Sequence, residues 1–285
     1  MNKYFFNLVK KLIPKISQTE LIALRSGTTS LDREIFQGKV NLSNIKPPNN
    51  DLTVTSKQTL KDFTPKVNHL LKTYRDKNVY PTHLSGEILD YVKKNKFFSF
   101  IIDQKYGGNK LSVSDLSSIL TKITTMNPAL GVVVMVPNSL GPGELLQHYG
   151  TEEQKTKFLP KLSNGDLVPC FGLTGPNNGS DAVGKIDEGT VIMKGNKKVI
   201  RLTINKRYIT LAPVANIVGL AFKLNDPDNL LTHGKEGVTV ALIEGNKPGL
   251  LKETYHNPMN AGFPNGTLKG TIDIELDDII GGEEN

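Results

Sequence analysis

The stretch CFGLTGPNNGSDAVG, residues 170–184, is the most informative part of this sequence. It sets four glycines and the turn formers Pro176, Asn177 and Asn178 around the hydroxyls of Thr174 and Ser180. Glycine lets a backbone approach a ligand closely, and proline and asparagine fix turns. Free N–H groups and hydroxyls in such a loop suit an anion such as a pyrophosphate. The alternative is a plain surface connection, because glycine-rich loops are common.

Length and charge set the limits for the other interpretations. The 285 residues can form one large or two modest domains. The net charge of +7 comes from scattered lysines, which favour anionic partners such as nucleotides, CoA or a membrane surface, or simply solvate the surface. No basic block with interleaved aromatics is present, so nucleic acid is not an expected partner. Neither GxGxxG after a strand nor GxxxxGK[ST] is present.

Cysteine and histidine give no support for a metal site. The single Cys170 excludes a disulfide framework and a cysteine-rich metal site. A lone cysteine beside an apolar strand is usually a buried small hydrophobe. The five histidines lack HxxH or HExxH spacing. We therefore expect no metal.

The first residues, MNKYFFNLVKKLIP, have an apolar run that is too short and too interrupted to cross a bilayer. They also lack a small-residue cleavage site. Lysines beside aromatics suit the surface of an anionic membrane, and the alternative is a leader helix that Pro14 ends. The predicted location is the cytoplasm, with peripheral contact at a membrane.

Helical signals fill the first half. An S-x-x-E capping box at Ser17–Glu20 predicts a helix start. Apolar residues three and four apart predict helices over Thr55–Tyr74, with a break or kink at Pro65, and over Ser112–Met126. A second capping box begins at Thr151. The apolar run from Ala129 to Pro137 is compatible with a strand or a helix, and periodicity does not decide between them.

After the turn signal Asn164-Gly165-Asp166 the period changes from helix to strand. The expected strands are Val168–Leu173, Val191–Lys194, Lys198–Ile204, Tyr208–Leu211, Ile217–Lys223, Val238–Ile243 and Gly270–Leu276. A run of helices followed by a run of strands predicts an α+β fold with segregated halves, not a Rossmann sheet.

The phrase LTGPNNGSDA, residues 173–182, resembles the flavin-binding signature of acyl-CoA dehydrogenases. Further phrases resemble this family in the same order: FF at 97–98, DQKYGG at 103–108, VPNSLGPGELLQHYG at 136–150, TEEQ at 151–154 and NKRYITLAP at 205–213. The resemblance is closest to the large bacterial fatty-acyl-CoA dehydrogenases and covers roughly Ser17 to Gly282. One departure is Gly175, where most of the family has a glutamate.

The resemblance implies an architecture. It predicts an N-terminal extension (1–54), a helical N-terminal domain (55–165) and a β-barrel-like middle domain (166–285), and it favours a helix over Ala129–Pro137. The family places its catalytic glutamate in a C-terminal helical bundle, which these residues do not include. We therefore expect a truncated or split enzyme with no catalytic residue of its own, weak FAD binding and little or no activity alone.

The resemblance also implies a cofactor site for FAD. Thr174 would hydrogen-bond the pyrimidine side of the flavin, and Thr210 would donate near its reactive nitrogen. Tyr208 takes the place of the usual tryptophan and would pack on the ring, while Ser180 would reach the pyrophosphate or the substrate's pantetheine. The expected cofactor-binding residues are Phe171, Gly172, Leu173, Thr174, Gly179, Ser180, Tyr208, Ile209 and Thr210, with Ser180 also binding substrate. Asn138 to Leu140 should wall the acyl pocket.

The implied reaction is α,β-dehydrogenation of fatty acyl-CoA in β-oxidation. The implied partners are fatty acyl-CoA, electron-transfer flavoprotein or a similar acceptor, and a separate C-terminal chain or a homo-oligomer. Two alternatives stay open at this point. One is part of an acyl-CoA oxidase, and the other is a non-catalytic remnant that binds acyl-CoA or a partner. Each site residue also has an ordinary explanation, because threonines favour strands and tyrosines fill cores.

Overall fold

The computed structural model describes residues 3–12, 18, 21–22, 25, 30–41, 43, 54–76, 86–139, 141–182, 184–232, 236–253 and 256–283. The predicted capping box at Ser17–Glu20 lies, apart from Gln18, outside these residues. The chain divides into two compact units, Met1–Asn50 with Asn178–Lys185, and Asp51–Asn177 with Ile186–Asn285. Each unit is described by itself.

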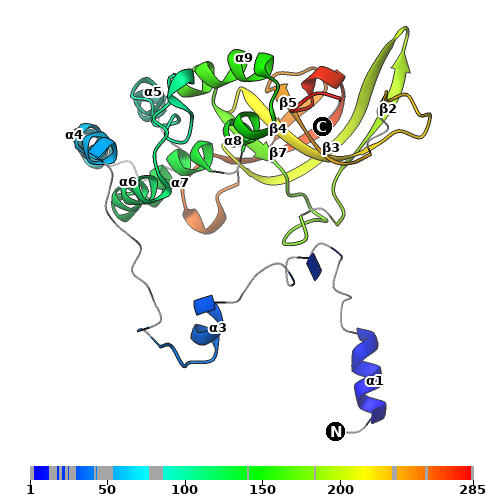
Figure 1. Cartoon of the computed structure of the whole chain (residues 1–285), viewed down its shortest axis with the longest axis horizontal. Coiled ribbons are helices and arrows are strands. Elements are labelled where there is room, and N and C mark those ends of the chain that lie inside the picture. Colours follow the sequence, from blue (N-terminus) through cyan, green and yellow to red (C-terminus); the bar gives the residue numbers. More distant parts are fainter. Residues whose placement is uncertain are drawn as a thin grey trace. The chain divides into compact units, whose positions relative to one another are not determined.

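Helices occupy the first half of the larger unit (Figure 1). They are α4 (Val54–Asp76), α5 (Gly86–Lys94), α6 (Val113–Met126), α7 (Pro128–Met135), α8 (Pro142–Tyr149) and α9 (Glu152–Ser163). The smaller unit contains α1 (Lys3–Leu12) and α3 (Ser30–Phe36).

The caps explain where several helices begin. The Ser112 side chain accepts the Asp115 N–H at the start of α6, and Thr151 and Gln154 form a reciprocal capping box at the start of α9. Asn127 caps α7 by accepting the Leu130 N–H, so the ambiguous apolar run is a helix. Of the break or kink expected at Pro65, the break does not occur, because α4 continues through this residue.

Strands follow as one mixed sheet of seven. They are β1 (Pro169–Gly172), β2 (Glu188–Lys194), β3 (Lys197–Thr210), β4 (Ile217–Asn225), β5 (Gly237–Glu244), β6 (Leu250–Glu253) and β7 (Asn265–Ile274). The order is β1-β4-β2-β3-β7-β6, with β5 paired to the other side of β4. β4 is parallel to β1 and β2, and the other pairs are antiparallel. The strands curl into a half-barrel beside the helices (Figure 1), which confirms the α+β class.

Three strand predictions were wrong in detail. Lys198–Ile204 and Tyr208–Leu211 are one strand, β3, because a bulge rather than a turn carries the backbone past Arg207. The strand expected over Gly270–Leu276 is β7, which begins earlier, at Asn265, and ends at Ile274. The short strand β6 was not predicted, because only Leu250 of its four residues is buried and no alternation is visible.

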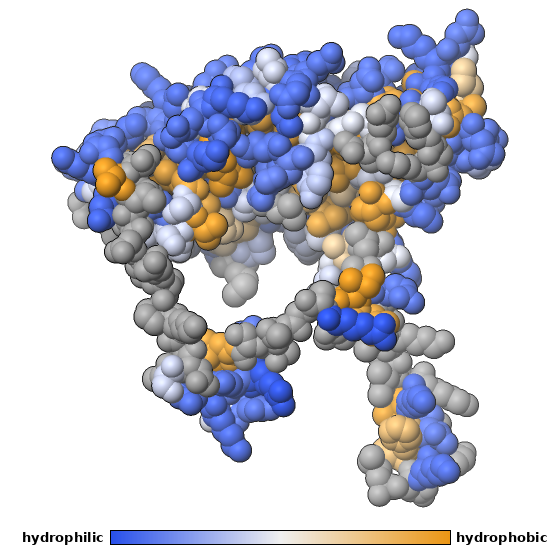
Figure 2. All heavy atoms as spheres, viewed as in Figure 1, coloured by the Kyte–Doolittle hydropathy of each residue, from blue (hydrophilic) through white to orange (hydrophobic). Residues whose placement is uncertain are grey.

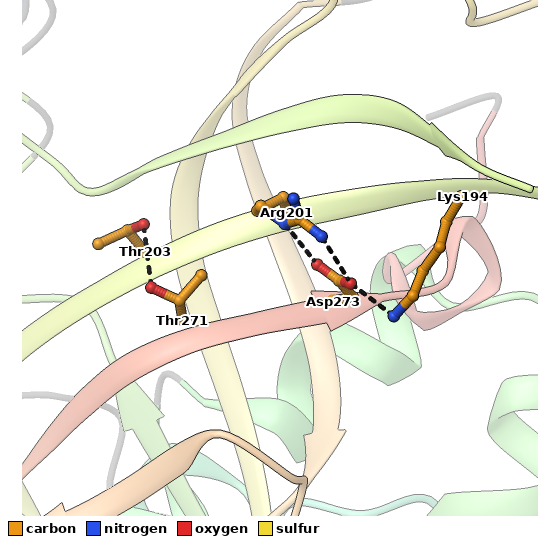
Figure 3. Close-up of polar contacts among 5 residues, drawn as sticks. All are labelled: Lys194, Arg201, Thr203, Thr271 and Asp273. Atoms are coloured by element: carbon orange, nitrogen blue, oxygen red, sulfur yellow. Dashed lines mark hydrogen bonds and ion pairs between the residues drawn. The ribbon is translucent and has the colours of Figure 1, made fainter.

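A polar cluster ties β3 to β7 on the solvent side (Figure 3). Asp273 accepts two hydrogen bonds from the Arg201 guanidinium, at 2.9 and 3.1 Å, and one from Lys194 at 2.8 Å. These bonds hold the pKa of Asp273 at about 2, below its usual 3.8. Thr203 and Thr271 bridge the same two strands at 3.4 Å.

Helices and strands share one core in the larger unit. Phe63 of α4 packs edge-on against Phe97 and Phe100, with ring centroids 5.5 and 4.8 Å apart, and this cluster is continuous with buried residues of the sheet such as Ile200 and Leu268. Among the described residues, the stretch Pro128–Tyr149 is long and apolar enough to cross a membrane, but 65% of its most apolar window is buried in the protein. It is divided between α7 and α8, so we assign it to the core.

Candidate functional site

The end of β1 begins the candidate site. Phe171 is half-buried and Gly172 is buried in the sheet. A side chain at Gly172 would bring its Cβ within 2.9 Å of Leu220 Cδ2, so close packing requires glycine there. Leu173 and Thr174 follow, half-buried, after the strand ends. The polypeptide therefore leaves the sheet edge at Thr174 with its backbone near the surface.

Thr174 is joined to β3 near its C-terminal end by two hydrogen bonds. The Arg207 N–H donates to the Thr174 carbonyl at 3.1 Å, and the Thr174 hydroxyl donates to the Arg207 carbonyl at 3.2 Å. Arg207 directly precedes Tyr208. The structure thus brings together the Leu173–Thr174 end of the glycine-rich stretch and the Tyr208–Thr210 segment, which lie more than thirty positions apart in the sequence.

Lys206 makes a second connection beneath this pair. Its side chain is only 1% exposed, and its Nζ donates to the Leu173 carbonyl at 3.0 Å and pairs with Asp187 Oδ2 at 3.2 Å. Burial lowers the pKa of Lys206, and Asp187 opposes that shift. Asp187 also accepts the Asn205 N–H at 3.0 Å. One buried cation therefore holds the Leu173 carbonyl in place.

The bulge in β3 presents Tyr208 to solvent. The register of β3 against β7 shifts between Lys206 and Ile209, and Tyr208 takes a left-handed backbone with φ 60°. Its ring is 54% exposed. The Arg207 guanidinium lies 5.1 Å from the ring centroid, and the His256 ring lies 4.9 Å away at 58°. About half of Tyr208 is therefore exposed, and Arg207 and His256 lie against its ring.

Ile209 and Thr210 differ in which of their atoms a ligand can reach. Ile209 is 2% exposed, so its side chain belongs to the core and only its backbone can reach a ligand. Thr210 is half-buried and stands opposite Asn265 in the β3–β7 ladder. Asn265 is 3% exposed, and its Oδ1 has no hydrogen-bond partner among the described residues. Buried amide oxygens are usually paired, so this atom is an unsatisfied acceptor beside Thr210.

The remaining predicted residues lie in the smaller unit. Gly179 and Ser180 are exposed, and nothing within 4 Å would meet a Cβ at Gly179. The loop closes on itself, since Asn178 Nδ2 donates to the Ala182 carbonyl at 2.8 Å and the Gly184 N–H to the Asp181 carbonyl at 3.3 Å. Ser180 is thus presented on a closed turn.

Asn138, expected in the acyl-pocket wall, holds neighbouring backbone in place through three hydrogen bonds. Its Oδ1 accepts the Phe100 N–H at 2.8 Å, and its Nδ2 donates to the carbonyls of Phe97 and Val134 at 2.6 and 2.8 Å. Leu140 lies outside the described residues. An open groove of about 520 Å³ does run past Asn138 and Ser139, lined mainly by α6 and by Met135.

Sequence reasoning missed Lys206 and His256. A lysine in a polar NKR triplet is normally a solvated residue, but the alternation of β3 places Lys206 on the same buried face as Leu202 and Ile204. His256 Nε2 lies 2.9 Å from the Thr267 hydroxyl, and no motif marks it. Together the segments present a flat aromatic ring, hydroxyls of Thr174 and Thr210, and an unpaired amide oxygen. This set suits a planar, polar heterocycle.

Three comparisons place the chain among known proteins. The family model "Acyl-CoA dehydrogenase, N-terminal domain" matches residues 56–166. An acyl-CoA dehydrogenase of Bacillus subtilis (strain 168) is 32% identical over 163 residues, which are 57% of this chain and 40% of that protein. The match spans less than half of that relative's length.

Solved structures agree with the fold. Butyryl-CoA dehydrogenase from Megasphaera elsdenii superposes with a TM-score of 0.69 at 20% identity, over 82% of this chain and 60% of that one. An FAD complex of PigA superposes with a TM-score of 0.65 at 20% identity, over 84% and 60%. The superposed stretches include both helices and sheet, so the combination of the two halves is common to these proteins.

Proposed function

We propose a function from the premise that this chain is a member of the acyl-CoA dehydrogenase family. The proposal is that its residues form the N-terminal part of an FAD-dependent enzyme that dehydrogenates fatty acyl-CoA between the α and β carbons. Residues 55–165 would be the helical domain and 166–285 the middle domain. The observation that supports it most is the pairing of Thr174 with Arg207, which sets the glycine-rich stretch beside Tyr208.

The cofactor proposal follows from what these residues offer. FAD, when bound, supplies the hydride acceptor for the acyl β-carbon. The chain's own part is placement. Tyr208 would pack against the ring, the hydroxyls of Thr174 and Thr210 would hydrogen-bond its polar edge, and the N–H groups near Thr174 would favour negative charge there. The buried Oδ1 of Asn265, unpaired among the described residues, is a suitable acceptor for a ring N–H.

No described carboxylate is assigned as the base that removes the α-proton. A further helical part would complete the FAD and acyl-CoA sites. It would belong to a separate C-terminal chain or to a longer form of the protein. Electron-transfer flavoprotein or a similar carrier would take the electrons. The proposed location is the cytoplasm, in peripheral contact with a membrane.

The test measures flavin absorbance and acyl-CoA oxidation together. The purified chain should bind FAD weakly and reduce an artificial acceptor hardly at all with a saturated acyl-CoA. A co-expressed helical segment that carries a suitably placed glutamate should raise both. Turnover at full enzyme rates by these residues alone would contradict the proposal that a further helical part is needed for catalysis. Absence of flavin in both samples would contradict the proposed FAD-dependent function. Oxygen uptake in place of carrier reduction would favour the oxidase alternative.

A further inference from the structure

The helix α1 has a sequence that separates two kinds of residue. Its ten residues, KYFFNLVKKL, include three lysines and no acidic residue. At the helical period Lys3 and Lys10, seven apart, share one side, while Phe5 and Val9, four apart, share the other. A short helix with a basic side and an aromatic side is the pattern of an interfacial membrane helix.

The apolar side of α1 is open. Phe5 and Phe6 are 59% and 51% exposed, and Lys3 and Lys10 are exposed as well. Figure 2 shows apolar and hydrophilic side chains gathered on different sides of α1. Phe5 and Phe6 are consecutive, so they point about 100° apart around the helix, and two exposed phenylalanines are unusual on a helix that packs into its own core, because aromatic side chains gain most from burial.

The charges on α1 indicate whether its exposed apolar side binds another protein or a lipid surface. A second protein surface would need matching acidic groups at fixed positions, whereas an anionic lipid surface complements lysines without fixed geometry. The exposed Phe36 of α3 gives a contrast, because its helix, SLDREIF, carries two acidic residues and one basic residue. Only α1 combines exposed aromatics with purely basic charge among the described helices.

We propose that α1 docks on the surface of an anionic phospholipid bilayer, with Phe5 and Phe6 entering the interface and Lys3 and Lys10 contacting the headgroups. The helix lies along the membrane and does not span it, since ten residues are too few to cross the hydrocarbon core. This inference rests on the peripheral membrane contact in the proposed function and names the segment that makes it, but it does not require dehydrogenase activity. Docking of α1 would bring the larger unit to the bilayer surface, where long acyl chains collect.

The experiment uses the absence of tryptophan from the sequence. Phe5→Trp places the only tryptophan of that variant on the apolar side of α1. Phe36→Trp, on α3, is the matched control. With vesicles of phosphatidylserine and phosphatidylcholine in equal amounts, Phe5→Trp should shift its emission to shorter wavelength, and Phe36→Trp should not. Phosphatidylcholine vesicles alone should leave both spectra unchanged, as should anionic vesicles in high salt.

Cosedimentation with the same vesicles gives the second measurement. Neutralising two lysines with Lys3→Gln and Lys10→Gln should weaken binding roughly thirtyfold, and Phe5→Ser with Phe6→Ser should abolish it. Phe36→Ser should bind like the unaltered chain. The proposal is overturned if the unaltered chain stays in the supernatant, or if the Phe5 and Phe6 variant still sediments. A Phe5→Trp emission that shifts with protein concentration in the absence of lipid would assign the helix to self-association instead.

Discussion

The Thr174 hydroxyl donates a hydrogen bond to the Arg207 carbonyl at 3.2 Å, and the Arg207 N–H returns one to the Thr174 carbonyl at 3.1 Å. This reciprocal pair fixes where the glycine-rich stretch leaves the sheet. It also sets the direction of the Tyr208 ring, because Arg207 is the last residue before the left-handed turn of the bulge. The proposed flavin platform depends on both ends of this pair.

Replacing Thr174 with valine tests the side-chain half of that pair. Thr174→Val keeps the shape and the backbone hydrogen bond but removes the hydroxyl. A neutral hydrogen bond is worth about 1 kcal/mol, so FAD affinity should fall about fivefold, as measured by equilibrium titration of flavin fluorescence. Thr203→Val is the matched control on β3, where the hydroxyl contacts only Thr271 at 3.4 Å. Equal affinities in the two variants would remove Thr174 from the site.

Lys206 supports the platform from inside the protein. Lys206→Met leaves the Leu173 carbonyl and the Asp187 carboxylate without their cation, and breaking a buried pair in this way should cost roughly 3 kcal/mol in the free energy of unfolding. Adding Asp187→Asn should recover part of that loss. Urea denaturation of the single and double variants measures both. Lys197→Met, at an exposed position of the same strand, should stay within about 0.5 kcal/mol of the unaltered chain.

Asp273 gives the fold a specific acid sensitivity. Its pKa falls from 3.8 to about 2 through its hydrogen bonds with Arg201 and Lys194. Because the folded pKa lies below the unfolded one, this stabilisation is complete above the unfolded value and is lost as the pH falls through the folded value. Asp273→Asn should therefore cost about 1 kcal/mol at neutral pH, after allowance for the exposed partners.

The pH dependence of that difference is the decisive part. The stability gap between Asp273→Asn and the unaltered chain should shrink below pH 3.8 and close near pH 2, as followed by denaturant titration at several pH values. Asp228→Asn, an exposed turn residue, should show no such trend. A gap that stays constant with pH would mean that the cluster in Figure 3 acts through packing and not through charge.

Cys170 should be chemically silent in the folded protein. It is fully buried in β1, and burial raises the pKa of its thiol to about 12. A thiol-specific reagent such as dithiobisnitrobenzoate should therefore modify it only after denaturation, releasing one equivalent per chain. Rapid modification in native buffer would show that the end of β1 opens, and the platform would then be less rigid than the structure indicates.

The sequence predicted those elements whose ends are set by contacts between residues close together in the chain. Ser112 and Thr151 were recognised as helix starts because their caps involve residues three positions away. The period change at Asn164–Asp166 located the transition from helices to strands. No break occurs at Pro65, because packing of α4, including the buried Phe63, offsets the local penalty of an interior proline.

The candidate site was predicted only where a sequence phrase carried it. Thr174 and Tyr208 stood in recognisable phrases, and the structure sets their segments side by side, while their contact with a flavin stays a prediction. Lys206 was not found because a lysine in a polar triplet is normally exposed, although the alternation of Leu202, Ile204 and Lys206 puts it on the buried face of β3. His256 was not found because its contacts with Tyr208 and Thr267 are made across the sheet.

The measurement that tests the central claim most directly places a fluorophore on the proposed platform. Tyr208→Trp makes residue 208 the only tryptophan of the chain, and Tyr149→Trp, at an exposed site on α8, is the matched control. If the flavin packs on this ring, FAD should quench most of the Tyr208→Trp emission in a saturable manner and leave the control nearly unchanged after correction for flavin absorbance. Equal quenching of both variants, or bound FAD without quenching of Tyr208→Trp, would contradict the account.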